Sequence, residues 1–193
     1  NLLRHPGWGR AQETYGEDPW LLGEFGLAAV KAIEKHNVMA CPKHFALNSI
    51  ENSRWKIDVS VDERTLREVY LPHFKKVIQK GKPASLMSAY NQVRGEYCGS
   101  NYELLTKILR EDWGFEGFVS TDWIWGIYDA KKAIKAGLNV EMPWQDEYNY
   151  NKIKSLIKSG EILISDIDKL VLNTLKTRLK YAFSYDSIDY NDN

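Results

Sequence analysis

The sequence has few cysteines, no excess of charge of either sign and no long apolar run, and each shortage excludes a class of protein. Its 193 residues carry 26 basic and 26 acidic side chains, so the formal net charge is zero. A zero balance gives no electrostatic attraction to nucleic acid or to an anionic membrane, and we expect neither as a partner. No apolar stretch approaches the roughly 20 residues that cross a bilayer. No signal peptide is visible, and the compartment stays open with a mild preference for the cytoplasm.

The two cysteines, Cys41 and Cys98, lie in unrelated contexts without metal-ligand spacing. Two reduced thiols are therefore expected. A glycine-rich phosphate loop is also absent, both of the dinucleotide and of the P-loop kind. This absence disfavours the nucleotide-binding folds that have an open sheet.

Aromatic residues, by contrast, are plentiful, with seven Trp and eleven Tyr. Aromatic rings stack on the apolar faces of sugars and also carry a polar group. Core filling is the simpler role for most of these rings, and Trp123 is the exception for which we favour binding.

Helical and extended patterns alternate along the chain, which predicts a single α/β domain. The expected strands are residues 38–45, 84–90, 117–122 and 138–142. The expected helices are residues 21–35, 62–80, 102–113, 128–135, 151–158 and 165–183. No internal repeat or low-complexity linker interrupts them.

Local signals predict several details of these helices. Asp62 is a candidate N-cap, and Pro72 should kink the helix that follows it. Ser165 and Asp168 fit a capping box at the start of the last helix. The spacing of apolar residues in the first helix predicts one buried face, made of Leu22, Phe25, Ala29 and Ile33.

Polar side chains gather where each expected strand ends. They are Lys43 and His44, then Ser88, Tyr90 and Asn91, then Asp122 and Trp123, and finally Glu141. Short apolar strands joined by helices predict a parallel sheet buried on both faces. In a β/α barrel, and also in an open doubly wound sheet, the active site lies at these carboxyl ends.

A complete β/α barrel needs about 250 residues and eight strands. Only four strands are visible here, with a fifth conceivable near the N-terminus. We therefore expect an α/β fold that is a partial (β/α)8 barrel over residues 1–183, with its N-terminal strands missing. A frayed polar tail is expected over residues 184–193.

Asp122 is the strongest candidate for chemistry. A carboxylate at a strand end beside tryptophans suits attack on a sugar carbon, as in retaining glycosidases, which form a covalent glycosyl intermediate. The alternative role is that of a helix N-cap for the segment that follows. The local sequence alone does not separate these two roles.

Lys43 and His44 both offer hydrogen-bond donors suited to sugar hydroxyls. His44 is equally compatible with a hydrogen-bonded core histidine, and Lys43 with a solvated strand end. A third interpretation makes Lys43 a Schiff-base lysine of an aldolase. Arg10 and Arg54 lie in loops, where they either clamp hydroxyls or form surface ion pairs of little energetic value.

Ordered motifs run through almost the whole chain. They are Gly-Arg-x-x-Glu at 9–13, Lys-His-Phe at 43–45, Met-Ser-Ala-Tyr-Asn at 87–91, Asp-Trp at 122–123 and Glu-Met-Pro at 141–143. From residue 1 to about residue 183, the sequence resembles the catalytic barrel of glycoside hydrolase family 3, in its β-glucosidase-like branch. The resemblance implies a retaining exo-β-glycosidase that uses no metal or organic cofactor.

The resemblance also implies roles for individual residues. Asp122 corresponds to the nucleophile, and Trp123 to a stacking residue. The groups that bind hydroxyls of the terminal sugar are Arg10, Lys43, His44 and Arg54. Met87 and Tyr90 resemble the walls of that subsite. The positions read as mainly structural are Glu13, Asp18 and Glu141.

Two departures from the family pattern matter. Thr121 precedes Asp122 where the family usually has serine, and the family's barrel begins well before this sequence does. The missing part would supply early strands and an aspartate that grips the sugar. In β-glucosidase-like members, the general acid/base comes from a second domain after the barrel. The N-acetylglucosaminidase branch is discounted, because its Pro-Gly-His-Gly marker is replaced by residues 46–49.

The resemblance thus predicts hydrolysis of terminal β-linked glucosyl or xylosyl residues from a β-glucoside or oligosaccharide. Activity is expected to need the missing barrel strands and acid/base domain, or a second copy of the chain. An inactive truncated fragment or a weak sugar-binding module is the alternative. A Schiff-base aldolase that uses Lys43 is a further one.

Overall fold

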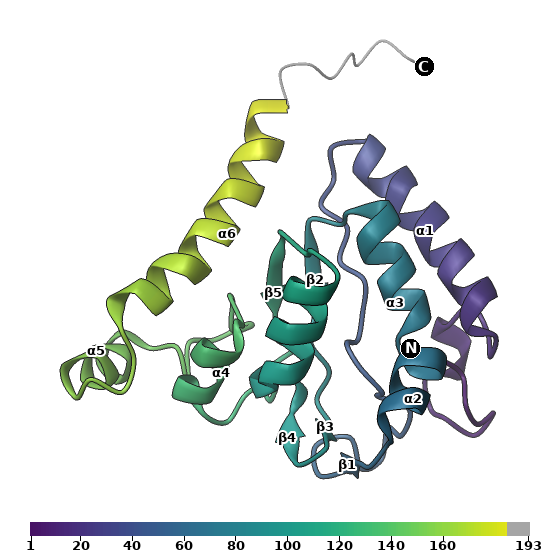
Figure 1. Cartoon of the computed structure of the whole chain (residues 1–193), viewed down its shortest axis with the longest axis horizontal. Coiled ribbons are helices and arrows are strands. Elements are labelled where there is room, and N and C mark those ends of the chain that lie inside the picture. The colour runs from purple at the N-terminus through teal and green to yellow at the C-terminus, as the bar shows by residue number, and fades with distance from the viewer. Residues whose placement is uncertain (185–193) are drawn as a thin grey trace.

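Two short parallel strands occupy the centre of the computed structural model, which describes residues 1–184 (Figure 1). They are β2 (Ser85–Met87) and β5 (Phe118–Ser120), whose residues pair one to one from Ser85 with Phe118 onwards. Of the predicted polar tail, residues 185–193 lie outside the described residues. Ser184 instead ends the last helix.

An extended segment flanks this pair of strands on each side. Phe45 forms a parallel bridge to Ser88, and Val140 forms one to Ser120. The four regions predicted as strands therefore lie side by side in chain order and run parallel. The predicted α/β class with parallel strands is confirmed.

The outer two regions are less regular than predicted, and full strands over 38–45 and 138–142 were wrong. Ala40 accepts a 3.1 Å hydrogen bond from the Ser85 N–H, but Pro42 has no N–H to donate. Each outer segment also pairs on one side only within the described chain. Within residues 1–184, the segment 38–45 pairs with one neighbouring strand only and lacks one N–H donor, so a regular strand does not extend over its eight residues.

A second, smaller sheet was not predicted from the sequence. Its strands are β1 (Asp58–Val59), β3 (Gln92–Val93) and β4 (Glu96–Tyr97), with β3 parallel to β1 and antiparallel to β4. Arg94 and Gly95 both have positive φ, at 55° and 85°, which suits the two-residue turn of a hairpin. Two-residue strands are too short to leave a periodic pattern in the sequence.

The first helix, α1 (Pro19–Lys35), was predicted almost to its ends, but its buried face was not. Asp18 caps it by accepting a 2.8 Å hydrogen bond from the Trp20 N–H. Phe25 is exposed, because α1 contacts α3 (Pro72–Lys76) through its glycines. A Cβ on Gly26 would lie only 3.0 Å from a Val77 methyl carbon.

The buried residues of α1 are Leu22, Gly23 and Val30. Ile33 is exposed as Phe25 is, while Ala29 is half-buried. The predicted face of Leu22, Phe25, Ala29 and Ile33 is thus wrong at two of its four positions. Large side chains gave the sequence signal, whereas close approach between the two helices requires small ones.

The predicted helix 62–80 exists but changes its winding along its length. Asp62 caps α2 (Glu63–Thr65), as predicted. A π-helical stretch, Leu66–Tyr70, ends before Pro72, and α3 passes into another, Val77–Gly81. The helix is thus interrupted at Leu71, directly before Pro72, where the sequence predicted a kink.

The remaining helices lie in front of β2 and β5 or beyond β5, on the side away from α1 (Figure 1). They are the π-helical Glu103–Asp112, α4 (Ala130–Ala136), α5 (Tyr150–Lys158) and α6 (Ile164–Ser184). Short 3-10 turns occur at Ala11–Glu13 and Cys98–Ser100.

The capping box predicted from Ser165 and Asp168 was wrong. Helix α6 begins at Ile164, and the Asp166 carboxylate accepts a 2.9 Å hydrogen bond from the Leu163 N–H.

The core lies between the parallel strands and the helices around them. Its fully buried side chains include Phe45, Leu86, Val119, Leu105 and Ile108. Within residues 1–184, no helix is both long and apolar enough to cross a membrane.

Candidate active site

The carboxyl ends of the parallel segments bring His44 and Asp122 together. His44 directly precedes Phe45, the last paired residue of the segment beside β2, and Asp122 follows β5 by two residues. The His44 Nε2 atom lies 3.4 Å from the Asp122 Oδ2 atom, and both residues are buried. Parallel strands place their carboxyl ends at one edge of a sheet, so residues 78 positions apart meet there.

The two carboxylate oxygens of Asp122 have different environments. Oδ1 accepts a 2.7 Å hydrogen bond from the Trp123 N–H. Oδ2 is buried without a hydrogen-bond partner among the described residues. Buried polar atoms are nearly always paired, so this unpaired carboxylate oxygen is an exception that needs an explanation.

The alternative role of Asp122 as a helix N-cap is wrong. Residues 123–126 form a turn and no helix, and the next helix, α4, begins at Ala130. That helix is capped by Asp129, whose side chain accepts a hydrogen bond from the Lys132 N–H.

The turn after Asp122 is tightly held. Ile124 has a φ of 69°, which costs a β-branched residue about 1–3 kcal/mol. Its N–H donates a 2.9 Å hydrogen bond to the Met142 carbonyl. A Cβ on Gly126 would lie 2.4 Å from the Thr121 Cβ, so only glycine allows the chain to fold back here. Strained backbone of this kind is frequent at functional sites.

His44 is a neutral imidazole at this site. Burial, together with the positive charges of Arg10 and Lys43, lowers its pKa to about 2. Arg10 Nη1 lies 3.2 Å from His44 Nε2. Because a guanidinium only donates, Nε2 accepts and the proton is assigned to Nδ1. The 3.4 Å approach to Asp122 is consequently a contact and not an ion pair.

Arg10 is fixed in place by a two-pronged ion pair. Its Nε and Nη2 atoms donate to the Glu13 carboxylate at 2.9 and 2.6 Å. This pairing raises the pKa of Arg10, so the guanidinium stays charged. The third nitrogen, Nη1, faces His44. Glu13 is structural in this arrangement, as the sequence predicted.

Arg54 is held by both charge and aromatic rings. Its Nη1 atom donates a 2.8 Å hydrogen bond to Glu51, which also accepts one from the Trp8 indole. The guanidinium lies 4.8 Å from the centre of the Trp55 ring and 4.5 Å from that of Tyr90. Such stacking differs from the exposed surface ion pair that was the alternative.

Tyr90 closes the site on the side of the turn. Its hydroxyl donates a 2.6 Å hydrogen bond to the Trp123 carbonyl. Burial raises the pKa of Tyr90 to about 12, with a further contribution from the negative charge of Asp122. The phenol is therefore a neutral donor next to the carboxylate. Met87 precedes it at the end of β2 and is half-buried.

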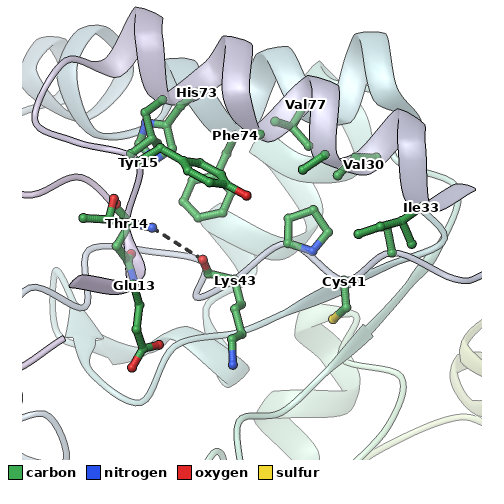
Figure 2. A pocket seen from close by; sticks show the side chains of 16 residues that line it. Glu13, Thr14, Tyr15, Val30, Ile33, Cys41, Lys43, His73, Phe74 and Val77 are labelled. Carbon is green, nitrogen blue, oxygen red and sulfur yellow. Dashed lines mark hydrogen bonds between the residues drawn. The ribbon is translucent and has the colours of Figure 1, made fainter. Parts of the chain in front are cut away.

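Lys43 and Trp123 are more exposed than the rest of the predicted set. Lys43 and Glu13 both line a pocket of about 240 Å³, and Figure 2 shows the Lys43 amino group and the Glu13 carboxylate turned in the same direction. That pocket lies between α1, α3 and residues 40–43, and neither His44 nor Asp122 lines it. Of the predicted site residues, Lys43 alone lines it, together with Glu13, the ion-pair partner of Arg10.

The other residues predicted to be structural have backbone partners. Glu141 accepts hydrogen bonds of 3.0 and 2.7 Å from the N–H groups of Glu147 and Tyr148. Asp18 caps α1. Sequence reasoning missed Glu51, although its position three residues before Arg54 is the spacing of a local ion pair.

No three His, Cys, Asp or Glu side chains in the described part of the chain are grouped so as to hold a metal ion.

Fold and site together define an α/β protein with a carboxylate, an imidazole and two guanidinium groups at the carboxyl ends of parallel strands. Residues 1–176 match the model of the glycosyl hydrolase family 3 N-terminal domain. The chain belongs to this family. The family membership predicted from the sequence motifs is thereby confirmed.

Known relatives are β-glucosidases and arabinopyranosidases of much greater length. The chain is 39% identical over 176 residues to thermostable beta-glucosidase B of Acetivibrio thermocellus, covering 91% of this chain and 23% of the relative. It is 34% identical to an exo-alpha-(1->6)-L-arabinopyranosidase of Bifidobacterium breve, covering 98% and 26%. The chain thus spans about a quarter of the length of these curated relatives.

Solved structures agree with this assignment. Beta-glucosidase 3B from Thermotoga neapolitana, in complex with glycerol, superposes with a TM-score of 0.89 at 40% identity, over 100% of this chain and 28% of that one. Beta-glucosidase from Kluyveromyces marxianus, in complex with glucose, gives a TM-score of 0.93 at 34% identity, over 96% and 22%.

Proposed function

We propose that this chain carries the nucleophile of a retaining β-glycosidase that removes terminal β-linked glucosyl or xylosyl residues. The observation that carries the proposal is the buried Oδ2 atom of Asp122, which lacks a partner among residues 1–184. It lies beside His44 and near the charge of Arg10. Membership of the family and the names of its relatives support a glycoside as substrate.

In the first half of the proposed reaction, Asp122 Oδ2 forms a bond to the anomeric carbon. The bond from that carbon to the leaving oxygen breaks, and a general acid protonates this oxygen. In the second half, the group that acted as the general acid now acts as a base and takes a proton from water. The water oxygen attacks the anomeric carbon, and Asp122 leaves with the bonding electrons.

The cationic side chains bind the sugar in this proposal. Arg10, Lys43 and Arg54 donate hydrogen bonds to hydroxyl groups of the terminal ring, and His44 adds a neutral partner. Binding energy from hydroxyls distant from the reacting carbon helps to distort the ring toward an oxocarbenium-like geometry. Met87 and Tyr90 form the walls, and Trp123 stacks on the substrate.

The general acid is proposed to lie outside this chain. A retaining mechanism needs a second carboxyl group about 5 to 5.5 Å from the nucleophile. Glu141 is at a neighbouring strand end, but backbone N–H groups already occupy its carboxylate. Relatives about four times as long have ample chain for a further domain. We further propose that residues 1–183 form part of a closed (β/α)8 barrel.

The aldolase alternative has no support in the site. Schiff-base lysines are activated by desolvation or by neighbouring cations. Lys43 is exposed, and its positive charge helps to lower the pKa of the nearby Glu13 carboxyl group. A sugar-binding fragment without activity remains the second candidate, favoured by the occupied carboxylate of Glu141.

The proposal is tested in the longest form of the enzyme that contains this chain. Asp122→Ala should lose nearly all turnover of an aryl β-glucoside, whereas the exposed Asp146→Ala should keep it. A 2-fluoro glycoside, which traps the covalent intermediate, should label the peptide that contains Asp122. Labelling at another carboxylate, with Asp122→Ala still active, would falsify the assignment.

A further inference from the structure

Three aromatic rings and one cation form a continuous array beside Asp122. The Trp55 ring contacts Trp125 edge to face, with ring centres 5.3 Å apart and an interplanar angle of 77°. Trp55 also lies 6.1 Å from the Tyr90 ring. Arg54 stacks between Trp55 and Tyr90. The family motifs drew attention to Tyr90 and Arg54 but not to Trp55 or Trp125.

The array is continuous with the nucleophile through the backbone. The Tyr90 hydroxyl and the Trp125 N–H both donate to the Trp123 carbonyl, at 2.6 and 2.9 Å. Trp123 in turn donates its N–H to the Asp122 carboxylate. The tight packing of Gly126 against residues 121 and 122 fixes the turn that carries Trp125. The position of the Trp125 ring is therefore tied to that of the carboxylate.

Trp125 is 49% exposed and lies in an exposed turn with Trp123 and Ile124, directly after the buried Asp122. An indole that filled the core would bury most of its surface. Here one partner, Trp55, fixes the ring, and half of it remains open to solvent. A ring that is already immobile loses little entropy when a flat ligand stacks on it.

We infer that the exposed face of Trp125, backed by Trp55, binds a planar aromatic leaving group of the glycoside whose sugar is attacked by Asp122. The inference rests on the proposed function and specifies the part of the substrate that departs. A flat aromatic ring gains from offset or edge contact with indole.

A second sugar fits this platform less well, because its hydroxyl groups need partners. The Trp55 indole N–H is buried, where a ligand does not reach it. The nearby Tyr97 hydroxyl already donates to the Trp55 carbonyl at 3.2 Å. The Trp55 and Trp125 rings thus offer mainly apolar surface, and the cation of the array, Arg54, is assigned to the terminal sugar and not to the leaving group.

The test uses the longest enzyme that contains this chain, in its Asp122→Ala form so that the ligands are not hydrolysed. Ligand-observed NMR measures the binding of phenyl β-D-glucopyranoside, methyl β-D-glucopyranoside and cellobiose. The phenyl glucoside should bind about tenfold more tightly than the methyl glucoside. Trp125→Ala should reduce this ratio to less than about twofold and leave the methyl glucoside unchanged. Trp125→Phe keeps a ring and should retain part of the preference.

Trp20→Ala is the matched control, since Trp20 is an exposed indole of α1 that contacts Lys76 and lies outside the array. It should leave all three affinities unchanged. Circular dichroism establishes that each variant is folded.

The outcomes separate the two proposals. Equal loss of phenyl and methyl glucoside binding in Trp125→Ala overturns the inference, as does a preference that survives this change. A gain for cellobiose as large as that for the phenyl glucoside overturns it too, in favour of a sugar leaving group. Binding of the phenyl but not the methyl glucoside, lost in Trp125→Ala, supports the aromatic platform and contradicts the proposed sugar site. No binding of any of the three ligands overturns both.

Discussion

A neutral imidazole and a charged guanidinium lie in contact at the candidate site, and this contact is not visible in the sequence. The motifs placed Asp122 and His44 at strand ends, because apolar runs with polar termini are easy to recognise. The Arg10–His44 contact joins residues 34 positions apart, and only the fold brings them together. The stacking of Arg54 between two rings likewise depends on loop geometry that has no periodic signal.

At this scale, substitution of the sugar-binding candidates gives a direct prediction. Lys43→Ala and His44→Ala should each lower kcat/KM for an aryl β-glucoside, by about 10- to 100-fold, in the longest enzyme that contains this chain. A site built to bond hydroxyls leaves them unpaired when a partner is removed. Lys107→Ala, on an exposed helix face, is the control. Unchanged kcat/KM in both variants would return them to structural roles.

The buried histidines predict how stability depends on pH. Burial lowers the pKa of His44 to about 2 and that of His73 to about 3, against about 6.5 in an unfolded chain. Below pH 6.5 the unfolded chain therefore binds more protons than the folded one. Stability is complete above this pH and falls as the pH decreases, by up to about 1.4 kcal/mol per pH unit for each histidine.

Urea unfolding at pH 7 and pH 5 measures this effect. Each buried histidine should contribute about 2 kcal/mol to the loss of stability between these values. His73→Phe should remove about half of this loss of stability, because His73 is one of the two buried histidines. A phenyl ring should fit there, since His73 already packs on the Phe74 ring. The exposed His36→Gln should remove none. An equal loss in wild type and in His73→Phe would contradict the neutral state of His73.

Elements were predicted well where a pattern was long and poorly where it was short. Helix α1 carries a proline at its start, a capping aspartate and seventeen residues, and its limits were predicted to within two residues. The strands of the small sheet β1–β3–β4 have two residues each and were missed. The outer parallel segments were predicted too long, because periodicity reports burial and not the presence of a partner strand.

One carboxylate joins three elements and gives a prediction for them. The Glu34 Oε1 atom, on α1, accepts 2.9 Å hydrogen bonds from the N–H groups of Ala40 and Ala84. These groups begin the extended segment before Phe45 and β2. Glu34→Ala leaves both without this acceptor and should cost about 2 to 3 kcal/mol.

Glu34→Gln keeps the acceptor oxygen and should cost less than about 1 kcal/mol. Lys35→Ala, an exposed change in the same helical turn, is the control. Urea denaturation of the three variants decides the matter. Equal losses in the alanine and glutamine variants of Glu34 would show that its charge, and not its hydrogen bonding, holds these elements together.

At the scale of the whole molecule, the two edges of the parallel array decide how the isolated chain behaves. The segment before Phe45 uses the carbonyls of Ala40 and Pro42 to bond β2, so Cys41 and Lys43 face the opposite edge. At that edge the Asn1 amino group donates to the Lys43 carbonyl at 3.4 Å. The pocket lined by α1 and α3 borders the same edge.

Helix α6 adds an apolar surface that the described chain leaves open. Its exposed large apolar side chains are Ile164, Val171, Leu172, Leu175, Leu179 and Phe183. An unpaired strand edge and an exposed apolar stripe both favour association with further polypeptide. We therefore expect the chain on its own to aggregate, to pair with a second copy or to need further segments of a longer enzyme.

The same structural facts predict that the isolated chain is not an active monomer. A closed barrel has no free edge, whereas the parallel array described here pairs its outer segments on one side only. The proposed mechanism also needs an acid that Glu141 does not provide, because backbone N–H groups occupy its carboxylate. Size-exclusion chromatography with light scattering, together with an aryl β-glucoside assay, should give an associated and inactive species. A well-behaved monomer with ordinary β-glucosidase turnover would show that the acid lies within this chain and that its edges are self-sufficient.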